Sequence, residues 1–218
     1  MAAGAIDLHT HYFPPAYMDL ARSLAAEASP VAADARLTYD HPQRSRDPMF
    51  SGALDERLAM MDAGGIEVQV LSFSAPNLWH PDPSVRAALV RTWNDGAIEL
   101  SRAHPDRFKV FANVPLPFVD EALAETQRVG DDPAVVGFGI CTHIDSTVVD
   151  DPAFERLYAA WNERGATVML HPDRFCVPGL LAAYGMEWSL GAVFDDTIAV
   201  IRILRSGLAA RFPRITWV

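Results

Sequence analysis

The chain has 218 residues, half of them hydrophobic, which suffices for one large domain or two small ones. Its formal net charge of −10 argues against nucleic acid or an anionic membrane as a partner, because both require a basic surface. Cys141 and Cys176 form no disulfide framework, and no run is long and apolar enough to span a membrane. Since the N-terminus also has no signal peptide pattern, we expect a cytoplasmic protein.

Short apolar runs, which predict strands, alternate along the chain with amphipathic stretches, which predict helices. The apolar stripe from Phe154 to Trp161 predicts a helix that ends at Gly165 and buries Trp161 against the sheet. A later helix, before Gly207, has an apolar stripe of its own, formed by Ile198, Ile201 and Leu204. The predicted strands lie at residues 3–8, 66–72, 107–113, 135–141 and 166–170, with the start of a sixth at 214–218.

This alternation predicts an α/β protein with a parallel sheet covered by helices. A doubly wound open sheet and a (β/α)₈ barrel both fit. The glycine-rich turn that follows the first strand of a dinucleotide-binding fold is absent, and histidines at a strand end favour the barrel, whose active site gathers at that edge. The chain supplies five βα units and the start of a sixth. We interpret residues 1–218 as one domain, with an inserted loop at 29–51.

The most specific motif lies in the first predicted strand, where His9 and His11 are separated by one residue. Side chains alternate along a strand, so both imidazoles, and Asp7 with them, are expected on one face. The fifth predicted strand ends in His171, at the same edge of a parallel sheet. Three neutral imidazoles around one open position would form a catalytic metal centre. We predict one divalent ion, zinc first and manganese as the alternative.

Five further side chains are candidates for contacts with a substrate. His143 follows the fourth predicted strand at the same edge as the metal centre. Arg44 and Arg46, in the irregular segment, have the charge and geometry to bind a carboxylate. Asn77 and Trp79 follow the second strand, where they would line a pocket. For each of the five, an ordinary structural or surface role is the open alternative.

In combination and order, these motifs resemble the amidohydrolase-related metal-dependent decarboxylases and hydrolases, which include the aminocarboxymuconate-semialdehyde and γ-resorcylate decarboxylases. The resemblance implies a distorted (β/α)₈ barrel with one divalent ion held by His9, His11 and His171. It also implies a catalytic histidine and an aspartate ligand at positions beyond Val218, so we expect a barrel truncated after about five and a half units. The matching segments are residues 6–11, 56–72, 104–108, 137–143, 170–172, 197–199 and 211–215.

The function implied by the resemblance is decarboxylation of a small aromatic or unsaturated carboxylic acid. Hydrolysis of a lactone, amide or ester is the first alternative, and hydration of a conjugated acid is another, because the shared ligands do not separate these reactions. A third alternative is an inactive metal-binding fragment that needs the missing C-terminal part. We expect self-association, most simply as a dimer, and no nucleic-acid or membrane partner.

Overall fold

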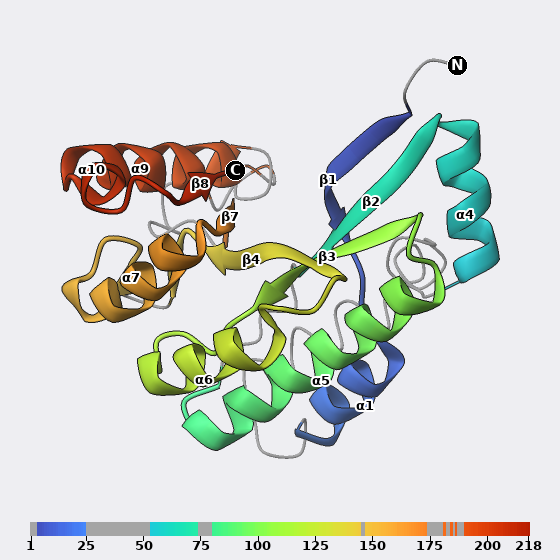
Figure 1. Ribbon diagram of the computed structural model, residues 1–218, viewed down its shortest axis with the longest axis horizontal. Helices are drawn as coiled ribbons and strands as arrows, with labels where there is room; N and C mark the ends of the chain where they lie inside the picture. Colours follow the sequence, from blue (N-terminus) through green and yellow to red (C-terminus); the bar gives the residue numbers. More distant parts are fainter. Residues whose placement is uncertain are drawn as a thin grey trace.

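The computed structural model describes residues 4–24, 53–73, 80–144, 147–173, 181, 184, 186 and 190–218. These residues contain a six-stranded parallel sheet in the order β1-β2-β3-β4-β7-β8 (Figure 1). The six strands are β1 (Ala5–His11), β2 (Ile66–Ser72), β3 (Phe108–Asn113), β4 (Val135–Cys141), β7 (Thr167–His171) and β8 (Thr216–Trp217).

The strand order distinguishes between the two predicted architectures. Each strand of the main sheet pairs with the next one along the chain, and the order never reverses. A doubly wound sheet reverses its strand order at the point where ligands bind, whereas a barrel does not. The sheet therefore has the topology of the first six strands of a (β/α)₈ barrel, as the sequence predicts.

Helices connect the strands and cover the sheet (Figure 1). Helix α5 packs against β3 and α1, helix α4 against β2, and helix α6 against α7. A short antiparallel pair, β5 (His143–Ile144) with β6 (Thr147–Val148), follows β4. The helices are α1 (Pro15–Ser23), α4 (Leu54–Ala63), α5 (Pro83–Ala103), α6 (Val119–Val129), the 3₁₀ turn η2 (Pro152–Phe154), α7 (Glu155–Arg164), α9 (Ala192–Arg205) and α10 (Leu208–Arg211).

Local sequence signals set the ends of the principal helices. At the start of α5 the Asp82 carboxylate accepts from the backbone N–H groups of Ser84 and Val85, at 2.8 and 3.2 Å, and Pro83 takes the first helical position. Helix α7 ends where Gly165 adopts a left-handed conformation with φ of 62°. None of the described helices is both long and apolar enough to cross a membrane.

Two apolar layers lie on opposite faces of the sheet. The larger layer fills the space between strands and helices, and there the buried Trp161 ring stacks on Phe138 with a centroid separation of 5.1 Å. The smaller layer, formed by Val70, Phe111 and Met169, lies on the face that points into the barrel. The predicted burial of Trp161 is thus confirmed.

The structure departs from the predicted elements in two places. Strand β1 runs over residues 5–11 rather than 3–8, so both histidines belong to the strand itself. The apolar stripe predicted on the last long helix is exposed, and α9 instead buries Ala199 and Ile203. Helical spacing identified an apolar face there but not the face that contacts the sheet. The predicted loop at 29–51 lies outside the described residues.

We predict that Trp161→Ala lowers the free energy of unfolding by about 3–5 kcal/mol, because it leaves a cavity beside Phe138. It also removes the hydrogen bond from the indole N–H to Thr126 Oγ1, which is 3.1 Å long. Chemical denaturation measures the change. The matched control is Leu204→Ala, whose side chain is 64% exposed and whose loss should shift stability by less than about 0.5 kcal/mol. Equal effects of the two substitutions would contradict the described packing.

Candidate metal centre

Three histidines converge at the carboxyl edge of the sheet. His9 and His11 come from β1 and His171 from the end of β7, and one ring nitrogen of each lies within 4.8 Å of the others. The three ring centroids are 4.9–5.0 Å apart, and the rings stand at 69–74° to one another. The structure therefore brings together the three ligands predicted from the sequence, in an arrangement that suits one small divalent cation.

Hydrogen bonds fix the tautomers of two of these rings. The Ser72 hydroxyl donates its hydrogen to the Thr10 carbonyl at 2.9 Å, so at 3.2 Å it accepts from His11 Nδ1. His171 Nδ1 lies 2.6 Å from the Pro172 carbonyl, which can only accept. In both rings Nδ1 therefore carries the hydrogen, and Nε2 keeps the lone pair that a metal ion requires.

The electrostatics also keep these rings neutral. Burial, together with the neighbouring His171 and His9 rings, lowers the pKa of His11 from 6.5 to about 3. Burial and the His9 ring lower the pKa of His171 to about 4. Because the neutral imidazole is the form that coordinates metals, both side chains are ready to bind at neutral pH.

A network around Arg57 holds the ligand-bearing end of β1. The buried guanidinium, which comes from α4, donates to the His11 carbonyl, to Thr10 Oγ1 and to Gln69 Oε1 at 2.8–2.9 Å. The Gln69 carboxamide in turn donates to the Asp7 carboxylate at 3.1 Å, and Asp7 accepts from the backbone N–H of His9 at 3.1 Å. The backbone at both histidines is thereby tied to one buried cation.

The position of Asp7 in this network corrects the prediction that it faces inward with the histidines. Between Asp7 and Thr10, β1 advances three residues while β2 advances two, from Gln69 to Leu71. Such a bulge inverts the alternation of side chains along the strand. Asp7 and Thr10 therefore lie on the helix-covered side with Arg57, and the strict period-two argument fails at this one step.

His143 lies in β5, just beyond the end of β4, and faces the start of α9. Its Nε2 is 3.6 Å from the Asp195 carboxylate, which also accepts from the Thr142 hydroxyl and, at 3.1 Å, from the backbone N–H of Asp173. The backbone N–H of Thr142 donates to the carbonyl of the candidate ligand His171 at 2.9 Å. His143 is thus adjacent to the metal-centre strand and has a carboxylate partner.

The sequence reading missed two acidic residues here. Asp195 is only 3% exposed, and burial followed by the neighbouring Asp195 charge raises the pKa of Asp196, whose Oδ1 is buried without a hydrogen-bond partner. Acidic residues are common in the first turn of any helix, so the only available signal was their place in an otherwise apolar stretch. The other four predicted substrate contacts, Arg44, Arg46, Asn77 and Trp79, lie outside the described residues.

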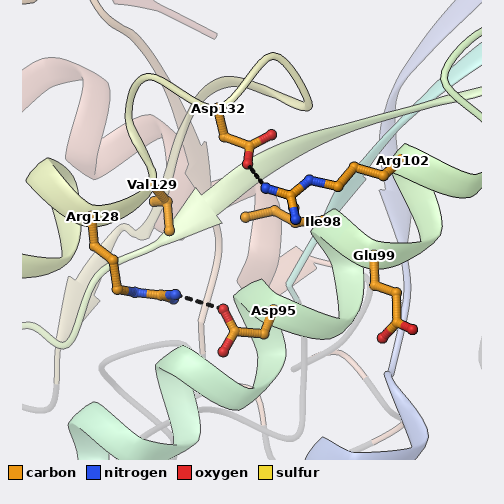
Figure 2. A pocket seen from close by; sticks show the side chains of 7 residues that line it. All are labelled: Asp95, Ile98, Glu99, Arg102, Arg128, Val129 and Asp132. Atoms are coloured by element: carbon orange, nitrogen blue, oxygen red, sulfur yellow. Dashed lines mark hydrogen bonds and ion pairs between the residues drawn. The ribbon is translucent and has the colours of Figure 1, made fainter.

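A separate hollow of about 370 Å³ lies on the outer surface, between α5 and α6 (Figure 2). Both of its arginines are paired: Arg128 contacts Asp95 at 2.6 Å, and Arg102 contacts Asp132. Because each guanidinium already has an aspartate partner, this hollow offers an anion little net attraction. The histidine cluster is therefore the stronger candidate for a functional site.

Comparison with known proteins agrees with this geometry. Residues 6–218 match the family described as Amidohydrolase. The chain belongs to this family. Among curated relatives, the gamma-resorcylate decarboxylase of Rhizobium radiobacter is 32% identical over 173 residues, which cover 74% of this chain and 53% of that protein. The chain thus spans about half the length of this relative.

Solved structures of the family confirm the fold. The 5-carboxyvanillate decarboxylase LigW of Sphingomonas paucimobilis superposes with a TM-score of 0.83 at 26% identity, covering 97% of this chain and 65% of that one. A 5-carboxyvanillate decarboxylase of Novosphingobium aromaticivorans, solved with manganese and 4-hydroxy-3-methoxy-5-nitrobenzoic acid, has a TM-score of 0.81 at 18% identity. The superposition covers 99% of this chain and 64% of the Novosphingobium chain, and at this identity it supports the fold alone.

We predict that Ser72→Ala weakens zinc binding by about tenfold to a hundredfold, because His11 Nδ1 loses its acceptor and the ring is no longer oriented. Competition with a chromophoric chelator measures the apparent Kd. The matched control is Ser101→Ala, which removes another buried hydroxyl donating to a carbonyl, that of Phe108, far from the histidines. Equal zinc affinities in the two variants would show that the Ser72 contact does not orient the ligand.

Proposed function

We propose that this protein is a metal-dependent decarboxylase of a small aromatic carboxylic acid. The observation that carries the proposal is the cluster of His9, His11 and His171, in which two rings present an Nε2 lone pair and the hydrogens are held elsewhere. A relative at 32% identity that is named for decarboxylation of such an acid supports this reading over hydrolysis.

The donor set suits one divalent ion. Three neutral imidazoles favour zinc, and manganese is the alternative because a protein of the same fold was solved with it. When bound, such an ion supplies Lewis acidity toward the carboxylate and a neighbouring oxygen of the substrate. The buried network around Arg57 would keep β1 in place while the ion binds and leaves.

Other residues of the chain would bind and orient the acid. We propose that His143, whose Nε2 lies 3.6 Å from the Asp195 carboxylate, contacts the substrate. Arg44 and Arg46 remain our candidates for charge neutralisation of a carboxylate, and Asn77 and Trp79 for lining the pocket. None of these roles requires a covalent intermediate on the protein.

The metal site is tested by elemental analysis of the purified chain after incubation with zinc or manganese and removal of free ions. We expect close to one ion per chain, and loss of most of it in a His9→Ala/His11→Ala variant, because two of the three imidazoles are gone. His104→Ala is the control, since this histidine caps α5 near the opposite edge of the sheet. Metal retained by the double variant would refute the proposed ligands.

The reaction is tested by measuring CO₂ release from 2,6-dihydroxybenzoate in the presence of the bound metal. We expect metal-dependent release that falls at least about a hundredfold in His171→Ala, because the substrate would lose its metal contact. Hydrolysis of an aromatic ester or lactone without CO₂ release would instead support the hydrolase alternative. Stoichiometric metal with neither reaction would show that this chain alone is a metal-binding segment.

A further inference from the structure

The Asp195 carboxylate is buried at the carboxyl edge of the sheet, next to the segment that carries His171. It comes from the first turn of α9 and is only 3% exposed. Its oxygens accept from the Thr142 hydroxyl and, at 3.1 Å, from the backbone N–H of Asp173, two residues beyond His171. The carboxylate therefore links α9 to the segment that follows β7.

One peptide group connects this carboxylate to the ring of His171. The carbonyl of Pro172 and the N–H of Asp173 belong to the same planar unit, and in a trans peptide they point in opposite directions. The N–H donates to the Asp195 carboxylate at 3.1 Å, and the carbonyl accepts from His171 Nδ1 at 2.6 Å. The contact between Asp195 and this peptide thus fixes the direction of the carbonyl that orients the ring.

Thr142 connects the same carboxylate to the backbone of His171. Its hydroxyl donates to Asp195, and its backbone N–H donates to the His171 carbonyl at 2.9 Å. Two successive carbonyl groups, those of His171 and Pro172, are therefore held in place by groups that contact Asp195. A ring attached to a backbone fixed in this way has little freedom to turn away from the other two histidines.

The charge of the carboxylate adds to this geometric effect. An ionised oxygen is a stronger acceptor than a neutral one, and hydrogen bonds in series polarise one another. Polarisation of the peptide by Asp195 makes the Pro172 carbonyl a better acceptor for the Nδ1 hydrogen of His171. A hydrogen held more firmly at Nδ1 leaves Nε2 as the basic nitrogen, the one that a metal ion would bind.

We propose that Asp195 is a positioning residue for His171, which acts through the Pro172–Asp173 peptide to select the Nδ1–H tautomer and to direct Nε2 toward His9 and His11. Ser72 orients His11 by direct contact, whereas Asp195 orients His171 across one peptide group. The inference rests on the proposed metal site for its functional meaning and does not depend on the reaction that follows. It gives α9 a part in metal binding although the ligands lie on β1 and β7.

The first test follows the ring nitrogens of the histidines by NMR, because protonated and unprotonated ring nitrogens have distinct chemical shifts. In the wild type we expect His171 to carry its hydrogen at Nδ1, and in Asp195→Ala to lose this preference. Asp195→Asn keeps an acceptor oxygen but removes the charge, so it should cause a smaller change in the same direction. The ring of His11, held by Ser72, should be unaffected and is the internal control.

The second test measures the apparent Kd for zinc by competition with a chromophoric chelator. We expect Asp195→Ala to weaken binding about tenfold to a hundredfold, and Asp195→Asn to weaken it less. The matched control is Asp150→Asn, which removes the charge of a carboxylate that contacts Arg202 of the same helix. This control should leave both zinc affinity and the His171 shifts unchanged.

Unchanged His171 shifts in Asp195→Ala would overturn the inference, as would an equal response of His171 to Asp150→Asn. Weaker zinc binding with unchanged His171 shifts would also overturn it, because Asp195 would then only stabilise the fold. If Asp195→Ala does not fold, the smaller change expected in Asp195→Asn decides. The ring shifts are measured without metal as well. If the wild type binds no zinc while His171 still responds to Asp195, the proposed metal site fails and the positioning role stands.

Discussion

The buried guanidinium of Arg57 is the group that holds the strand end bearing two of the three histidines of the candidate metal centre. Because an arginine side chain stays protonated, this buried charge needs its hydrogen-bond acceptors on β1 and β2 whenever the protein is folded. One of these acceptors is the His11 carbonyl, and another leads through Gln69 and Asp7 to the backbone of His9. The bulge in β1 places Thr10 on the side of this charge, where its hydroxyl accepts from Arg57, and leaves both histidines on the opposite face.

Arg86 is as deeply buried as Arg57 but differs from it in its hydrogen bonding. Both arginines are 4% exposed, yet Arg57 donates to three protein acceptors while Arg86 leaves two nitrogens unpaired. Removing the first would break a network that the fold completes by itself. The second has no hydrogen-bond acceptor for its Nε and Nη1 among the described residues, although the Asp173 charge acts on it. Two arginines of equal burial therefore differ in how far the described residues satisfy their hydrogen-bonding groups.

Much of the fold and the convergence of the three candidate ligands could be predicted from the sequence, because both depend on regular patterns. Apolar runs located the strands, and the shared carboxyl edge of parallel strands placed His171 beside His9 and His11. The direction of Asp7 could not be predicted, since a bulge depends on the partner strand rather than on local sequence. The burial of Asp195 and the exposure of the α9 stripe depend on how a helix is oriented against the sheet, which helical spacing alone does not specify.

The location of the candidate ligands within the chain makes the proposed metal site independent of the proposed reaction. His9, His11 and His171 lie in β1 and β7 of one continuous parallel sheet, with Ser72 and the Pro172 carbonyl fixing two of the rings. Relatives in this family extend well beyond the matched region, so groups outside this chain can contribute to their reactions. The histidine cluster needs none of them to present its lone pairs. A measured metal affinity would therefore test the geometry of this sheet, whereas a measured reaction would also depend on the groups around it.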